Sequence, residues 1–162
     1  MSPARDPLRA HVLELLQGGQ AHTTFEDAVA DLPAAQRGLT PAGAPHSAWQ
    51  LVEHIRITQH DILRFSTNVD GQYASPTWPE GYWPAEAAPP TRVAWDQTVK
   101  AVLDDRAAME RLVSDFSTDL LAPFPWGSGQ TVLREALLVA DHTSYHVGQL
   151  VIVRRILGAW SD

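Results

Sequence analysis

The residues LREALLVADHTSYHVGQLVIVRRILGAW, positions 133–160, decide the fold of this chain. Their apolar side chains recur every three or four residues, which predicts one long helix with an apolar face. Two histidines, His142 and His146, lie on that face. They are four residues apart, about one helical turn, so we expect their Cβ atoms to be roughly 5–6 Å apart. Two imidazoles at this separation can reach one metal ion.

Three further amphipathic stretches precede this segment, and each predicts a helix. The first begins at Pro7, bends at a Gly-Gly pair and extends as far as Pro33. The second covers about residues 46–67, where Ser47 begins a capping-box pattern. The third covers about residues 91–115. No stretch shows the alternating pattern of a strand.

Four long amphipathic segments predict an all-α fold, a four-helix bundle. The length of 162 residues favours a single domain that spans residues 1–162. Residues 68–91 carry five prolines and two glycines, which excludes a continuous helix. We expect this Pro- and Trp-rich segment to form a long loop that packs on the domain, and loops of this length are often functional.

Composition narrows the class of function. The formal net charge of −7 argues against general binding to nucleic acid, which relies on Lys and Arg to neutralise phosphates. The chain has no cysteine, so it offers neither a thiolate nucleophile nor a cysteine-type zinc site. We find no secretory signal at the start and no run of ~20 apolar residues, and we therefore expect no membrane partner and a cytoplasmic location.

A third histidine, His54, lies on the apolar flank of the second predicted helix. Together with His142 and His146 it predicts a site of three neutral imidazoles, which leaves a divalent ion an open position for water or substrate. Two other metal sites are excluded. No glutamate follows His142, as the H-E-x-x-H motif of zincins requires. The chain also has no Glu-x-x-His pair, which a di-iron bundle requires on two helices.

Three other side chains are candidates for the site. Asp61 lies seven residues after His54 on the same flank, where it can orient His54 or transfer a proton, or simply be a solvated aspartate. Gln149 lies on the histidine face and can bind a ligand or satisfy a core group. Tyr145 is a candidate for lining the pocket, although buried aromatic residues more often belong to the core.

The segment DHTSYHVGQLVIVRRILGAW with its H-x-x-x-H-x-G-Q motif, together with His54, resembles the DinB/YfiT-like superfamily of bacterial metal-binding bundles. The early GGQAHTTFEDAVADLP stretch and the Pro- and Trp-rich middle segment are similar as well. This resemblance implies an up-down-down-up four-helix bundle, a metal site at His54, His142 and His146, zinc or nickel as the ion, and a homodimer.

The resemblance also implies candidate activities, because relatives include transferases and isomerases that use low-molecular-weight thiols. An ion in an open site can bind an external thiol as thiolate and lower its pKa. The same site can activate water for hydrolysis, and no residue in the sequence decides between the two. A non-catalytic metal-binding stress or sensor protein is the alternative. In the enzymatic case the partner is a small-molecule substrate.

Overall fold

The computed structural model describes residues 6–160, and within them the protein is all-α without a strand. The α-helices are α1 (Pro7–Gln17), α2 (Phe25–Val29), α3 (Ala48–Ser66), α4 (Ala94–Ser114) and α5 (Val132–Ile156). The all-α prediction is therefore confirmed. The predicted second, third and fourth helices agree with α3, α4 and α5 to within a few residues at each end.

Side-chain caps explain where the helices begin. Asp6 accepts hydrogen bonds from two backbone N–H groups in the first turn of α1, and Thr24 caps α2 in the same manner. Ser47 and Gln50 form the predicted capping box at the start of α3. Thr131 caps α5 through the backbone N–H of Arg134. These caps satisfy N–H groups that have no partner inside the helix.

The first predicted helix differs from the structure, since its second part is shorter than expected. α2 ends at Val29, and Asp31 adopts a left-handed backbone with φ of 55°. Pro33 disfavours helical geometry at the residue before it, which contributes to this early end. Arg154 of α5 donates to the carbonyl of Ala28 at 2.7 Å and so satisfies an acceptor where α2 stops.

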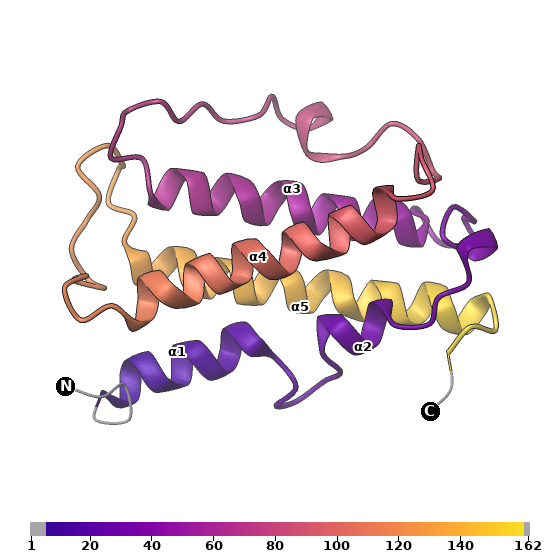
Figure 1. Ribbon diagram of the computed structural model, residues 1–162, viewed down its shortest axis with the longest axis horizontal. Coiled ribbons are helices and arrows are strands. Elements are labelled where there is room, and N and C mark those ends of the chain that lie inside the picture. The colour runs from indigo at the N-terminus through magenta and orange to yellow at the C-terminus, as the bar shows by residue number, and fades with distance from the viewer. Residues whose placement is uncertain (1–5, 161–162) are drawn as a thin grey trace.

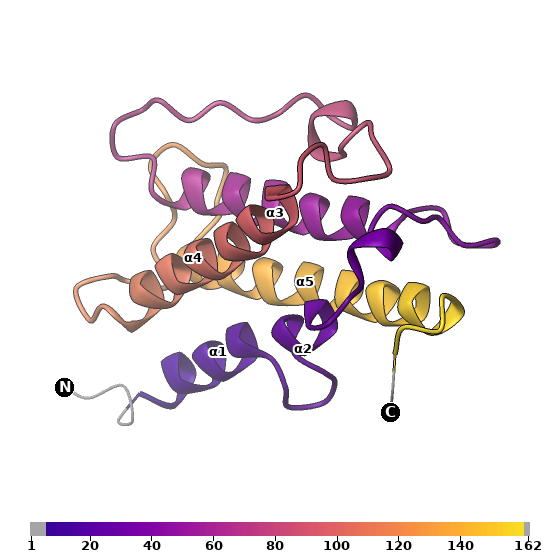
Figure 2. The same cartoon turned by 45° about the vertical axis from the view of Figure 1, so that its right-hand side comes forward.

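The long helices lie side by side in one bundle (Figure 1). In that view α1, α2 and α5 run from left to right, and α3 and α4 run from right to left. The segment between α3 and α4 travels back along α3, on the side away from α1, in both views (Figure 2). It contains one short 3₁₀ turn, η3 (Glu80–Tyr82).

The interior consists of two apolar clusters placed end to end along the bundle. One cluster ends on α3 at Ile55 and begins on α5 at Val147. The other begins on α3 at Ile62 and ends on α5 at Ala140. The middle of the bundle between these limits is therefore not filled by apolar side chains alone.

Polar side chains lie within this middle zone and at its border, and we call His54, Gln59, His142 and His146 the polar layer. Gln59 is 3% exposed, and its amide donates to the carbonyl of Val102 on α4 at 2.6 Å. Its burial is thus compensated by a hydrogen bond, as buried polar groups require. The three histidines need partners for the same reason.

Within residues 6–160 no helix has the combination of length and hydropathy that a membrane span needs.

Candidate metal centre

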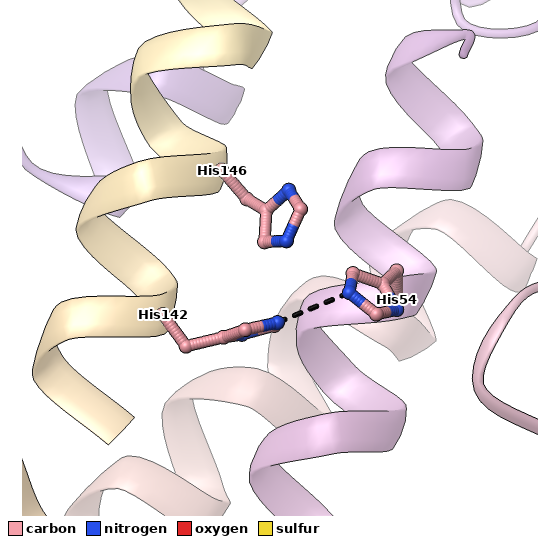
Figure 3. A group of neighbouring side chains, drawn as sticks. All are labelled: His54, His142 and His146. Carbon is pink, nitrogen blue, oxygen red and sulfur yellow. Dashed lines mark hydrogen bonds between the residues drawn. The ribbon is translucent and has the colours of Figure 1, made fainter. Parts of the chain in front are cut away.

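The polar layer brings together three histidines from two helices (Figure 3). His54 comes from the middle of α3, and His142 and His146 come from consecutive turns of α5. His54 and His146 are only 4% and 6% exposed. All three rings point into the space between the two helices. The three residues selected from the sequence are thus neighbours in the fold.

The distances suit a shared ion. The Nε2 atoms of His54 and His142 are 3.0 Å apart, and one nitrogen from each of the three rings lies within 4.8 Å of the other two. Nitrogen ligands of a tetrahedral zinc ion, bound at about 2.1 Å, would be roughly 3.4 Å apart. Side-chain shifts on the order of 1 Å therefore suffice to bring the three nitrogens to one ion. This three-histidine group can hold a divalent metal.

The backbone of the long loop determines which nitrogen of His54 is free. Its Nδ1 lies 2.7 Å from the carbonyl oxygen of Tyr82, so Nδ1–H donates and the lone pair stays on Nε2. The neighbouring Trp83 ring stacks on His54, with centroids 3.8 Å apart and planes 3° from parallel. His46 stacks on the other face of Trp83, at 4.0 Å between centroids. The loop thus orients His54 from two directions.

A side chain on α5 performs the same task for His146. The Oε1 atom of Gln149 lies 2.7 Å from Nδ1 of His146, three residues earlier on the same helical face. Nδ1–H therefore donates to Gln149, and Nε2 remains available to an ion. Hydrogen bonds of this kind to the remote nitrogen are typical of metal-binding histidines. Gln149 satisfies a core group, one of the two roles predicted for it.

Asp61 lies elsewhere than expected, because it makes no direct contact with His54. Its Oδ1 accepts from the hydroxyl of Tyr73 at 2.9 Å, and its Oδ2 accepts from the hydroxyl of Tyr82 at 2.7 Å. Both carboxylate oxygens are thus engaged by the loop, and direct orientation of His54 by Asp61 is corrected to an indirect connection. Asp61 anchors the residue whose carbonyl holds His54.

Burial keeps the imidazoles neutral. It lowers the pKa of His142 to about 3, and the neighbouring His146 and His54 reinforce this because charges of one sign repel. Burial also lowers the pKa of His146 to about 4, although the bond to Gln149 opposes the effect. The pKa of His54 is lowered by burial as well. Near neutral pH the three rings therefore carry the lone pairs that a metal needs.

The remaining candidates lie at the edge of the site or away from it. Tyr145 is 64% exposed, and its ring meets the His146 ring edge-on at 4.9 Å between centroids. His60, also on α3, does not belong to the three-histidine group, and its Nδ1 lies 3.0 Å from Oδ2 of Asp105. The sequence analysis missed Tyr82 and Trp83. The aromatic residues of the loop predicted that it packs on the domain, but no pattern indicated which of them reaches His54.

Comparison with known proteins assigns the chain to a family. The model of the DinB superfamily matches residues 8–150, which include all three histidines. The chain belongs to the DinB superfamily. No curated protein and no solved structure matches the chain significantly. This DinB-superfamily bundle therefore shares with its family the region that runs from α1 through Gln149 and Leu150 of α5.

Proposed function

We propose that this DinB-superfamily chain is a divalent-metal protein that transfers a low-molecular-weight thiol to a small-molecule substrate, or performs a related hydrolysis. The observation that supports it is the convergence of three neutral imidazoles, of which His54 and His146 are buried and have Nδ1–H already bonded to an acceptor. Zinc and nickel are the ions we favour, because imidazole nitrogen is a preferred ligand of both.

Each residue of the site has a role in this proposal. His54, His142 and His146 would hold the ion. Tyr82 and Gln149 hold the tautomers of His54 and His146, respectively. When bound, the ion would stabilise the thiolate of an external thiol and so make it nucleophilic near neutral pH. The chain itself has no cysteine, so this thiol has to be supplied by a second molecule.

A metal-binding protein without turnover, such as a stress or sensor protein, is the alternative. Its support is the burial of His54 and His146 together with the Trp83 ring that covers one face of His54. A covered site suits an ion that remains in place. Exchange of an ion-bound water with solvent distinguishes the two cases, because the enzyme requires an exchangeable position and the alternative does not.

We also propose the remaining family properties for this chain. The helix directions in Figure 1 support an up-down-down-up topology. A homodimer is supported by apolar side chains that α5 exposes, among them Tyr145 and Ile152 at 64% and 57% exposure. We further propose one domain and a cytoplasmic location.

Metal content tests the proposal first. The protein is purified without an affinity tag, and elemental analysis is carried out for the wild type, His146→Ala and His60→Ala. We expect about one equivalent of divalent metal in the wild type and in His60→Ala, and none in His146→Ala. His60 is the matched control, because it is a half-exposed histidine of α3 that contacts Asp105 rather than the centre. Equal metal content in all three proteins would refute the site.

Turnover is tested next on metal-loaded protein. Mycothiol and bacillithiol are supplied with the electrophile 1-chloro-2,4-dinitrobenzene, and formation of the thioether is followed by absorbance. A rate that exceeds the uncatalysed one and disappears in His146→Ala supports the transferase. Full metal loading without any rate, and without exchange of bound water, would favour the alternative.

A further inference from the structure

A cavity lies on the C-terminal side of His146, and its lining includes Gln149, which contacts His146. It has a volume of about 180 Å³ and lies between the loop before α3 and the last turns of α5. Leu51 and Val153 line it and are 1% and 3% exposed, and Pro45 adds a further apolar wall. Ile152 and Ile156 line it with half-exposed side chains. The cavity is thus apolar inside and accessible at its mouth.

The polar groups of this cavity are few and uncharged. Its lining contains no Lys, Arg, Asp or Glu. Gln149 contributes its amide, whose Oε1 already accepts from His146. The amide nitrogen of Gln149 has no partner among residues 6–160, so it remains a hydrogen-bond donor. The cavity therefore favours a neutral ligand that brings an acceptor.

Two of the lining residues also belong to the surroundings of the metal centre. Gln149 holds Nδ1 of His146, and His46 stacks on Trp83, which in turn stacks on His54. A ligand that occupies this cavity therefore lies beside Gln149, which orients His146 directly, and beside His46, which is linked to His54 through Trp83. Such contacts can change the affinity of the centre for its ion.

We propose that this cavity is the substrate-recognition pocket of the metal centre. Its ligand is a small neutral molecule with a single ring or a branched apolar group and one carbonyl-type acceptor. An apolar cavity on the order of 150 Å³ holds one benzene ring, so the volume here accommodates one ring with a short substituent. The amide of Gln149 donates to the acceptor. The connection to the metal rests on the proposed function, whereas binding to the cavity does not.

Fluorine NMR titration tests the proposal with two probes of similar shape. 4-Fluoroacetophenone carries a ring and a carbonyl acceptor, and 4-fluorotoluene carries the ring without the acceptor. For metal-free wild-type protein we expect 4-fluoroacetophenone to bind about fivefold more tightly, because one net hydrogen bond distinguishes the probes. Ile156→Trp, a change at a half-exposed position of the mouth, should weaken both probes at least tenfold.

Gln149→Glu removes the amide N–H group that is proposed to donate to the ligand. A carboxylate still accepts from Nδ1 of His146, so we expect this variant to keep one equivalent of zinc while it loses the preference for 4-fluoroacetophenone. Zinc should change the affinity of 4-fluoroacetophenone for the wild type at least twofold, and the probe should change the affinity for zinc by the same factor. Equal affinity with and without zinc would overturn the connection to the centre.

Two results separate the pocket from the proposed function. A protein that binds no zinc but shows the probe preference refutes the metal centre and retains the ligand pocket. A protein that binds zinc but neither probe refutes the pocket. Sedimentation of the wild type and Ile152→Glu completes the test: if the wild type is a dimer that binds neither probe and Ile152→Glu is a monomer, a second copy of the chain covers the cavity, and the proposal is overturned.

Discussion

The imidazole of His54 donates a hydrogen bond of 2.7 Å to the backbone carbonyl of Tyr82, twenty-eight residues further along the chain. This bond connects a helix of the bundle with a segment that has almost no regular structure. The hydroxyl of Tyr82 is in turn bound to Asp61, two helical turns after His54 on α3. Tyr82 therefore attaches the loop to α3 at two points, His54 and Asp61.

Asp61→Asn should weaken metal binding although Asp61 does not contact the centre. The amide accepts from one tyrosine hydroxyl but presents its NH₂ group to the other, so the attachment of Tyr82 loosens. We expect the dissociation constant for zinc to increase about tenfold, as changes in groups that orient metal ligands commonly cause. Competition with a chelating dye measures this dissociation constant.

Asp70→Asn is the control for this change. Asp70 lies in the same loop with a half-exposed side chain 3.8 Å from Arg64 and makes no contact with a tyrosine hydroxyl. The dissociation constant of Asp70→Asn for zinc should equal that of the wild type. Equal zinc affinity in Asp61→Asn and wild type would show that the loop does not orient His54.

Gln149→Leu should reduce metal affinity at the other end of the centre. Leucine offers no acceptor to Nδ1 of His146, so the imidazole loses the bond that holds its tautomer. We expect a 10- to 100-fold increase in the dissociation constant for zinc, measured by the same competition. Gln149→Glu keeps an acceptor and should remain within a few-fold of the wild type. Similar losses in both variants would contradict this role.

The stability of the metal-free protein should depend on acid through the centre. In the unfolded chain these histidines titrate near pH 6.5, whereas in the folded protein burial lowers the pKa of His142 to about 3 and that of His146 to about 4. Between pH 6.5 and about 4 the unfolded state therefore binds more protons, and the free energy of unfolding decreases as the pH falls. Above pH 6.5 these histidines are neutral in both states, so they do not lower the free energy of unfolding there.

Urea unfolding at several pH values measures this dependence. Near pH 5 we expect the two histidines to account for about two protons taken up on unfolding, from the slope of the free energy against pH. His142→Asn removes one of them and should reduce the uptake by about one proton. Slopes that agree between His142→Asn and wild type would contradict the assignment of the neutral imidazole.

Trp83→Leu should destabilise the metal-free protein, because the indole ring fills the space between His46 and His54. Loss of two stacked contacts is expected to cost on the order of 1–3 kcal/mol in the free energy of unfolding. Trp78→Leu is the control: Trp78 belongs to the same loop but is 72% exposed, so the cost should be below about 0.5 kcal/mol. Equal losses of unfolding free energy in the two variants, measured by urea unfolding, would show that Trp83 does not stabilise the centre.

Much of the bundle could be predicted from local patterns. The apolar periodicity of residues 133–160 and the capping box at Ser47 depend only on neighbours within a helical turn or two, and both correspond to α5 and α3. The early end of α2 was not predicted, because a carbonyl there is satisfied by Arg154 from the far end of the chain.

In the candidate site, too, the features set by local sequence could be predicted, whereas those set by distant contacts could not. The spacing of His142 and His146 is a local property, and His54 was found because it lies on an apolar flank. The contribution of Tyr82 is made by a backbone carbonyl, which every residue possesses, so no residue type marks it. Asp61 was selected for its position on the helix, but the direction of its side chain depends on where the loop tyrosines lie.

The polar layer also affects the axial alignment of α3 relative to α5. Apart from Trp49, the apolar seams of α3 and α5 on either side of it consist of Leu, Val, Ile and Ala, which can still make apolar contacts after displacement by one turn of about 5.4 Å. Such a displacement would separate His54 from at least one of His142 and His146, which is costly because polar rings in the interior would lose a contact. The histidines therefore favour one axial alignment of the two helices.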